Sequence, residues 1–498
     1  ERRGGEVVAH ALAWLNGHSQ GPFFMWVHLY DPHDPYDPPE PYKTRYAKEP
    51  YDGEIAYMDS VVGKLFDELK ARGLYDGALI AVMADHGESL GAHGEDTHGV
   101  FLYDETIHVP LVIKLPHEGE AGERIENRVE LVDVLPTLLQ EVGVAVPAEV
   151  QGKSLLGLIK AGATGNAEDT ELWRDQPAYS ETDYPRTAFG WSAERSLRTG
   201  KYLYIQAPRQ ELYDQTADPK AIHNLSATST AVSSTLAEQV KAFRAKTSSN
   251  REAPKAVVDP SAQEKLAALG YASGGPVKAD TSAAGADPKD KIEISNMVHR
   301  ANALREKGNF KDAAALLQQI IAKDPGLTGM YTKLADNLLD LKEYQQAVPV
   351  LRKAVELDPE SPMSHFQLAK GLMGMGDFAA AVPELEFTVS KIPNFADAHV
   401  FLEMAYARTN RVPETIRECR TVLEFLPDHY GSYLILGRFL EMSGDLDGAV
   451  SNLKKAATLN PEAPEPHLIL ADVYGHLGRE ADSAHEMAEA KRLGAGGQ

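Results

Sequence analysis

A glycine-rich stretch, ADHGESLGAHGEDTHG at residues 84–99, carries three histidines and four carboxylates and directly follows the apolar run at residues 78–84. Asp85 and His86 are adjacent at the end of that run, and a carboxylate beside an imidazole suits a hard or borderline divalent cation. Gly87 lets the chain turn away without placing a side chain there. The stretch therefore predicts a metal-binding loop. We expect His93, Glu88 and Glu95 to be solvated loop residues.

The sequence contains three short continuous apolar runs, which are typical of buried parallel strands. The first two precede the two histidine-bearing loops. The runs lie at residues 23–29, 78–84 and 109–115. The loop at residues 28–42 is too rich in proline to be helical. Apolar residues spaced by three and four over residues 54–72 predict an amphipathic helix that stops at Gly73. Strand, helix and strand in succession predict a mostly parallel α/β sheet with both loops at its ligand-binding edge.

The middle of the chain changes in character. Residues 195–213 have the pattern of a β-hairpin, in which Arg195, Arg198 and Lys201 could line an anion pocket or form a solvated face. Residues 226–290 are rich in Ser, Thr, Ala, Gly, Pro and Lys and predict a linker, with one short helix at residues 261–271.

Residues 291–493 repeat with a period of 34, and three kinds of residue mark the repeat. Prolines occupy one register: Pro325, Pro359, Pro393, Pro427 and Pro461. A turn register holds Gly308, Lys342, Gly376, Asn410, Gly444 and Gly478. A small-residue register, where helices must approach closely, holds Ala313, Ala347, Ala381 and Ala449. This period predicts an all-α solenoid of about six tetratricopeptide (TPR) repeats.

Charge and composition limit the functional classes. The chain of 498 residues has a formal charge of −23, which disfavours nucleic acid as a general partner. Its single cysteine, Cys419, excludes an intramolecular disulfide and a cysteine-based metal cluster. We find no apolar run of membrane-spanning length and no signal-peptide pattern, and the sequence begins with Glu1.

Residues 1–225 resemble the carboxyl-terminal portion of a sulfatase of the alkaline phosphatase superfamily. The similar segments are FFMWVHLYDPHDPY, the continuous stretch from Tyr51 to Ile113, and RTGKYLYIQAPRQELYDQTADPKAIHNL. The resemblance implies an α/β domain that hydrolyses sulfate esters with a divalent metal, most often Ca²⁺, although Mg²⁺, Mn²⁺ or Zn²⁺ would also fit. It also implies a location in the periplasm, at the cell envelope or outside the cell.

Particular residues take family roles by position. Asp85 and His86 match the second pair of metal ligands. His33, in PHDP, matches a histidine that contacts the sulfate ester. His98 lies next to Gly99, the position where many relatives place a sulfate-binding lysine, and we expect His33 and His98 to be the catalytic histidines.

Two parts of the family's machinery have no counterpart in this sequence. The nucleophile of sulfatases is a formylglycine made from Cys or Ser in a Cys/Ser-x-Pro/Ala-x-Arg motif, and Cys419 has neither the proline nor the arginine. The first metal-ligand pair, Asp-Asp, is also missing. We therefore expect a fragment without its amino-terminal portion that does not turn over substrate by itself.

Alternative functions remain open. A phosphodiesterase or phosphoethanolamine-type transferase of the same superfamily would share the Asp-His pair, and a non-catalytic TPR scaffold would need no active site. TPR arrays usually bind extended peptides in a groove. We expect one row of that groove to hold Asn302, Asp336, Lys370, Met404, Arg438 and Asp472, whose mixed charges do not identify the partner.

Overall fold

The computed structural model describes residues 2–18, 21–164, 176–247 and 285–494. These residues divide into two compact units. Unit 1 comprises the described residues up to 186, residues 191–247 and residues 285–299, and unit 2 comprises residues 187–190 and 300–494. The short helix predicted at residues 261–271 lies outside the described residues. None of the described helices is long and apolar enough to cross a membrane.

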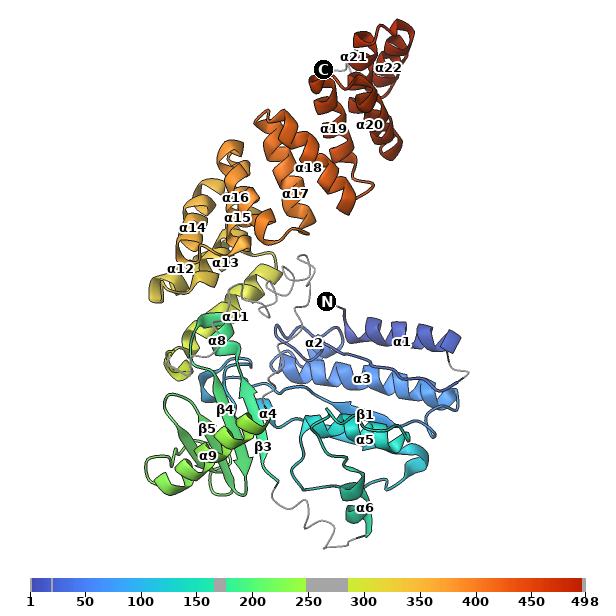
Figure 1. Cartoon of the computed structure of the whole chain (residues 1–498). Helices are drawn as coiled ribbons and strands as arrows, with labels where there is room; N and C mark the ends of the chain where they lie inside the picture. The colour runs from blue at the N-terminus through green and yellow to red at the C-terminus, as the bar shows by residue number, and fades with distance from the viewer. Residues whose placement is uncertain (1, 19–20, 165–175, 248–284, 495–498) are drawn as a thin grey trace. The chain divides into compact units, whose positions relative to one another are not determined.

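The first part of unit 1 contains helices and one strand pair (Figure 1). Its elements are α1 (Gly4–His18), α2 (Tyr42–Arg45), α3 (Pro50–Ala71), β1 (Ile80–Met83), α4 (Asp104–Ile107), β2 (Leu111–Lys114), α5 (Val134–Glu141) and α6 (Leu156–Thr164), with short 3-10 helices at Ala92–Gly94, Pro116–Glu118 and Leu131–Asp133. Helix α3 confirms the amphipathic pattern. It packs against α1 through a small core around Val8, Val61 and Leu65, and Gly73 follows its end with a φ of +67°.

The parallel pairing expected from the apolar runs is wrong, although the α/β class is confirmed. Strands β1 and β2 pair antiparallel, with Ile80 opposite Lys114 and Met83 opposite Leu111. A parallel pair is usually joined by a crossover helix, but the chain between β1 and β2 holds only a loop and short helical turns. Residues 23–29 form no strand, and Trp26 and Val112 are 66% and 62% exposed.

The second part of unit 1 is a four-stranded antiparallel sheet in the order β3 (Ala178–Thr182), β4 (Glu194–Thr199), β5 (Tyr202–Gln206) and β6 (Glu211–Asp214). This confirms the hairpin predicted at residues 195–213. Helix α9 (Thr230–Thr247) packs against β4 and β5 and buries Leu236 and Val240 (Figure 1). Helix α8 (Tyr184–Phe189) connects β3 to β4.

The predicted linker is therefore too long at both ends. Helix α9 belongs to the core of unit 1 because its apolar side chains complete the sheet's hydrophobic cluster. At the other end, Asp287 accepts hydrogen bonds from the backbone of Arg209 and of Lys289, and Lys289 forms an ion pair with Glu211. Small polar residues suggested a linker, but a few well-spaced apolar and charged side chains are enough to hold these segments in place.

Unit 2 is a succession of antiparallel helices, as the 34-residue period predicts (Figure 1). The helices are α11 (Ile292–Glu306), which begins in unit 1, then α12 (Phe310–Lys323), α13 (Thr328–Asp340), α14 (Tyr344–Leu357), α15 (Pro362–Gly374), α16 (Phe378–Lys391), α17 (Ala396–Arg408), α18 (Val412–Phe425), α19 (Tyr430–Ser443), α20 (Leu446–Leu459), α21 (Glu465–His476) and α22 (Glu480–Arg492). All six residues of the predicted turn register have positive φ, from +57° at Asn410 to +86° at Gly444. The four alanines of the small-residue register are fully buried.

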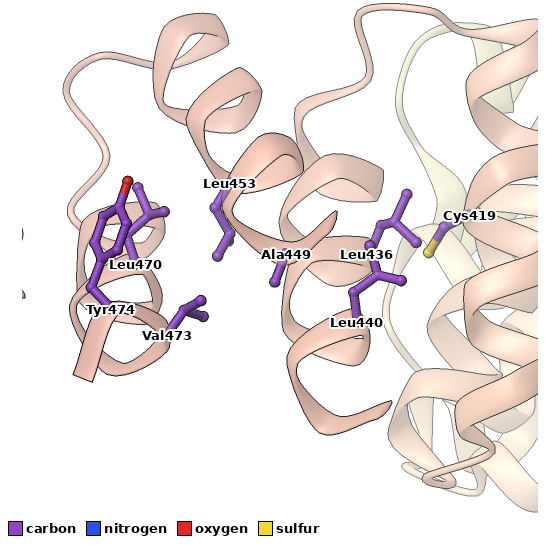
Figure 2. Packing of buried hydrophobic residues seen from close by; sticks show 8 residues of the cluster. All are labelled: Cys419, Leu436, Leu440, Ala449, Leu453, Leu470, Val473 and Tyr474. Atoms are coloured by element: carbon purple, nitrogen blue, oxygen red, sulfur yellow. The ribbon is translucent and has the colours of Figure 1, made fainter. Parts of the chain in front are cut away.

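Neighbouring repeats share a continuous hydrophobic core. Figure 2 shows one such cluster. Cys419 of α18 lies at one end, next to Leu436 and Leu440 of α19, and Ala449 and Leu453 of α20 follow. Burial and the neighbouring Glu403 raise the pKa of the Cys419 thiol far above its ordinary value. Cys419 is thus an inert core residue and not a nucleophile.

One polar contact also repeats with the period. The side chain six positions after each repeat's proline forms a hydrogen bond with the carbonyl oxygen of that proline. The four residues are Tyr331, His365, His399 and Tyr433. In His399 the other ring nitrogen, Nδ1, faces a carboxylate oxygen of Glu418 at 2.5 Å. Both partners are acceptors, so the imidazole must carry two protons to satisfy them. Burial opposes this charge, but Glu418 and the Pro393 carbonyl raise the pKa of His399 above its usual value.

The turn register makes a direct prediction about stability. Replacing Gly376 (φ +82°) by Ala forces a side chain into the left-handed region and should destabilise unit 2 by roughly 1 kcal/mol. Gly329 lies in α13 with open space around it, so Gly329→Ala should leave stability equal or higher. Calorimetric unfolding of both variants measures the difference, and equal losses would contradict the turn assignment.

The His399–Glu418 pair predicts a pH dependence. Because the folded-state pKa of His399 is raised, its stabilisation is full below the unfolded-state pKa and is lost as pH rises through the folded-state pKa. The double variant His399→Tyr/Glu418→Asn copies the residues found one repeat later, Tyr433 and Asn452. Scanning calorimetry from mildly acidic to mildly alkaline pH should show a smaller decline for this variant than for the parent chain. An identical decline would exclude His399 as its source.

Candidate functional site

The two histidine-bearing loops meet in unit 1, as the sequence predicts. His33 comes from the proline-rich loop, and His86 and His98 come from opposite ends of the glycine-rich loop. The ring centroids of His86 and His98 are 3.9 Å apart in a stacked arrangement, and that of His33 lies 5.1 Å from His98. One nitrogen of each ring lies within 4.8 Å of a nitrogen of the other two. These three residues are called the histidine cluster below.

Asp85 lies at the rim of the histidine cluster. Its side chain is 80% exposed, and its Oδ1 lies 3.8 Å from Nε2 of His86. The same oxygen accepts a hydrogen bond from the backbone N–H of His86. The carboxylate is thus close enough to share a cation with the neighbouring imidazole after a small side-chain movement.

The proline-rich loop is held by a buried carboxylate of α3. Glu54 accepts hydrogen bonds from the backbone N–H groups of His33, at 3.0 Å, and Asp37, at 2.8 Å. Burial raises the pKa of Glu54. The His33 ring stacks on Tyr30 at 4.3 Å, and its Nδ1 lies 2.7 Å from the carbonyl oxygen of Asp34. Helix α3 therefore holds the backbone of His33 through Glu54, and Tyr30 and Asp34 orient its ring.

Gly87 allows a close backbone approach on the far side of the glycine-rich loop. Its N–H donates to the carbonyl oxygen of Thr106 at 2.8 Å, and a Cβ there would lie 2.2 Å from the carbonyl oxygen of Glu105. No side chain fits at this distance. The sequence predicts that this glycine keeps a side chain out of the site. In the structure, the glycine is needed because the loop packs closely against α4.

Glu95 is buried and not solvated, contrary to expectation. Only 2% of its surface is exposed, and burial raises its pKa. Its carboxylate accepts hydrogen bonds from the Ser89 hydroxyl and from the backbone N–H groups of Val100 and Phe101. These hydrogen bonds engage polar groups inside a loop that has few apolar side chains to form a core. Glu95 therefore sets the course of the loop between His86 and His98.

Glu88 is also buried, where solvation was expected, with 3% of its side chain exposed. One of its oxygens lies 3.0 Å from Nδ1 of His98. Burial alone would raise the pKa of Glu88, but the hydrogen bond from His98 and the nearby imidazoles hold it below its usual value. In turn, burial disfavours charge on His98, but Glu88 raises the pKa of His98. Glu88 thus orients His98, a role that the residue pattern did not indicate.

Two further residues support the loop from outside the cluster. The ring of His93 stacks on Tyr103 with centroids 3.5 Å apart, so His93 is a packing residue. Asn296 of α11 donates to the carbonyl oxygen of Gly94 and accepts from the backbone N–H of Asp96. Asn296 lies some 200 positions away in the sequence, and no local pattern could have identified it.

The three basic residues considered for an anion pocket all have carboxylate partners. Arg195 pairs with Glu181 and Asp183, Arg198 with Asp104, and Lys201 with Asp214. An anion would have to displace these partners. The three side chains therefore support the sheet in this structure.

The donors around the cluster suit a divalent cation. Nε2 of His33 is buried and has no hydrogen-bond partner among the described residues. Asp85 adds a carboxylate, and imidazole with carboxylate is a common ligand set for borderline divalent metals, whereas Ca²⁺ prefers oxygen ligands alone. The residues present therefore fit a bound cation.

Comparisons with known proteins match both the amino-terminal and the repeat regions of the chain. A Sulfatase family model matches residues 5–144, a model of the carboxyl-terminal region of N-sulphoglucosamine sulphohydrolase matches residues 94–246, and a tetratricopeptide repeat model matches residues 304–370. The second match includes α9, in agreement with its place in unit 1.

Similar proteins share only part of their length with this chain. An N-acetylglucosamine-6-O-sulfatase of Bacteroides thetaiotaomicron is 29% identical over 35% of this chain and 31% of its own length. The multifunctional alkaline phosphatase superfamily protein PehA of Trinickia caryophylli is 27% identical over 43% of this chain and 54% of its own length. The solved structure of a phosphonate monoester hydrolase of Agrobacterium radiobacter is 25% identical, with a TM-score of 0.42. The match covers 48% of this chain and 60% of the hydrolase chain.

The chain thus spans about a third to a half of the length of the curated relatives that it matches. Its matched segments carry both histidine-bearing loops and the antiparallel sheet. The amino-terminal part of this chain is therefore similar to sulfatases and to a protein of the alkaline phosphatase superfamily, and a region that matches tetratricopeptide repeats follows it.

Proposed function

We propose that unit 1 takes part in the metal-dependent hydrolysis of sulfate esters. The observation that supports this proposal most strongly is the meeting of His33 and His98, from two separate loops, beside the Asp85–His86 pair. Buried carboxylates hold both loops, so the imidazoles are positioned before any ligand arrives. Such preorganisation is what catalysis requires and what a solvated surface loop lacks.

In this proposal, Asp85 and His86 contribute to holding a divalent cation. The cation would neutralise ester oxygens and lower the pKa of an oxygen nucleophile. His33 and His98 would contact the ester, and one of them would supply the proton that the leaving oxygen needs. Glu88 is a positioning residue, because it accepts a hydrogen bond from Nδ1 of His98 and leaves Nε2 to face the site. Arg195, Arg198 and Lys201 are not part of the proposed site.

The nucleophile is the second part of the proposal. The family resemblance implies a formylglycine, and this sequence has no motif from which one could be made. We therefore propose that turnover needs residues beyond these 498, together with the first metal-ligand pair. By the same resemblance, we propose that the protein acts in the periplasm or cell envelope, which cell fractionation would test.

Aryl-sulfate hydrolysis by the natural full-length protein tests the site. Asp85→Ala should remove both the cation and the activity, and His33→Ala or His98→Ala should lower kcat by about 100-fold or more through the lost proton transfer. His108→Ala changes an exposed histidine outside the cluster and should leave the activity intact. Metal content and initial rates are measured for each variant.

Two outcomes would count against the proposal. Normal activity in Asp85→Ala would exclude its part in the metal site. A strong preference for an aryl phosphodiester over the aryl sulfate would instead favour the phosphodiesterase or transferase alternative. A full-length protein that binds no cation and turns over neither ester would favour the scaffold alternative.

We also propose that the TPR array binds an extended peptide. The row of groove residues is half-buried at Asn302, Asp336 and Lys370 and exposed at Met404, Arg438 and Asp472. In the first repeats these side chains are already engaged: Lys333 donates to Asn302, and Gln367 donates to Asp336. The exposed later repeats are therefore the part of the row where a peptide would bind.

A peptide array with the whole chain tests this assignment. Met404→Glu should weaken binding of the selected peptides, because it replaces an apolar contact by a charge, and Arg438→Glu should change their charge preference. Lys353→Glu, on helix α14 and outside this row, is the matched control. Binding that responds equally to all three variants would indicate a nonspecific charge effect and would contradict a groove in the later repeats.

A further inference from the structure

Three imidazoles point unengaged nitrogens toward one another in the histidine cluster. Among the described residues, Nε2 of His33 is buried without a hydrogen-bond partner. Nε2 of His86 lies 3.8 Å from Oδ1 of Asp85, too far for a hydrogen bond, and none of the hydrogen bonds described involves Nε2 of His98. Polar atoms that converge without partners mark a place where a ligand is missing.

The other nitrogen of each ring is engaged in a way that fixes the ring. Nδ1 of His33 faces the carbonyl oxygen of Asp34 at 2.7 Å, and Nδ1 of His86 faces that of Gly87 at 3.1 Å. Nδ1 of His98 faces the buried Glu88 carboxylate at 3.0 Å. Each of these oxygens can only accept, so each Nδ1 carries the proton and each Nε2 can offer a lone pair.

This arrangement is the one that metal-binding histidines use. A ligating imidazole generally donates its second N–H to a carbonyl or carboxylate, which fixes the tautomer and raises the basicity of the ligating nitrogen. All three rings have such a partner here, and for His98 the partner is a carboxylate. Three imidazole ligands suit a borderline transition metal better than Ca²⁺ or Mg²⁺.

We propose that His33, His86 and His98 form a three-histidine site for a borderline divalent metal of the zinc class, oriented by the Asp34 and Gly87 carbonyls and by Glu88. The site goes beyond the proposed function, because it needs neither Asp85 nor an ester. It uses only residues that this chain contains. Asp85 or water completes the coordination from the exposed side.

The separations allow such a site with little movement. Zinc–nitrogen bonds of about 2.1 Å place two tetrahedral ligand nitrogens roughly 3.4 Å apart. The present nitrogens lie within 4.8 Å of one another, so small side-chain rotations would bring them to the spacing that one ion requires. His86 and His98, which now stack at 3.9 Å, would turn about their χ angles to do so.

Occupation of this site would compete with the proposed hydrolysis. The site takes up His33 and His98, the two groups that the proposed function assigns to the ester. We therefore expect zinc to inhibit aryl-sulfate hydrolysis competitively in the full-length protein. The competition deepens the proposed function, but the binding itself does not depend on it.

Titration of the whole 498-residue chain with ZnCl₂ against a chromophoric chelator tests the proposal, with CoCl₂ as a spectroscopic probe. We expect one tight ion per chain and visible cobalt bands typical of nitrogen ligands. His33→Ala and His98→Ala should each weaken zinc binding at least 10-fold. Glu88→Gln, which keeps the shape of the side chain, should weaken it by about 10- to 100-fold through the lost carboxylate partner.

Two controls separate this site from the proposed hydrolase cation and from misfolding. Asp85→Asn should leave zinc affinity within about three-fold while it impairs the cation of the hydrolase, and His93→Gln tests a loop histidine outside the cluster. Circular dichroism confirms folding of each variant. Zinc affinity unchanged in His33→Ala or His98→Ala would overturn the proposal, as would loss of zinc binding in Asp85→Asn equal to that in His98→Ala. Absent zinc binding with intact hydrolysis would overturn this site alone.

Discussion

The buried carboxylate of Glu95 is the constraint on which the site depends. A loop of sixteen residues with four glycines has little apolar surface with which to fold, so its course must be set by hydrogen bonds. Glu95 accepts three of them, from Ser89, Val100 and Phe101. These bonds bring the two ends of the loop together, and His86 and His98 stack there as a result. Glu88 and Asn296 then add to this support by holding His98 and the middle of the loop.

The carboxylates of unit 1 thus divide into two kinds. Glu54, Glu88 and Glu95 are buried and hold backbone or ring nitrogens, whereas Asp85 is exposed and has an oxygen to offer to a ligand. Burial distinguishes support from chemistry here more clearly than residue type does. Arg195, Arg198 and Lys201 differ from both kinds: they pair with carboxylates that are partly exposed, and the pairing itself keeps them from a ligand.

How much the sequence could predict differs between the two units. In unit 2 each repeat has the same neighbours, so a period of 34 determines the turns, and even Lys342 and Asn410 take the left-handed conformation of the glycines that they replace. In unit 1 two of the three apolar runs contain strands, β1 and β2, but the runs do not reveal the direction in which these strands pair. Asp85 and His86 were predictable from their place just after β1, whereas His33 and His98 were indicated by the family resemblance. Glu88, Glu95 and Asn296 were not, because their roles depend on contacts that only the folded loop creates.

The close approach at Gly87 has a consequence for how this region can diverge. The backbone of the loop lies so near to the Glu105 carbonyl that the gap is thinner than a methyl group. Any natural variant that replaced this glycine would have to shift α4, and with it the start of β2. Insertions and substitutions should therefore accumulate elsewhere on the domain, and the close contact between the Gly87 loop and α4 should be retained in related sequences.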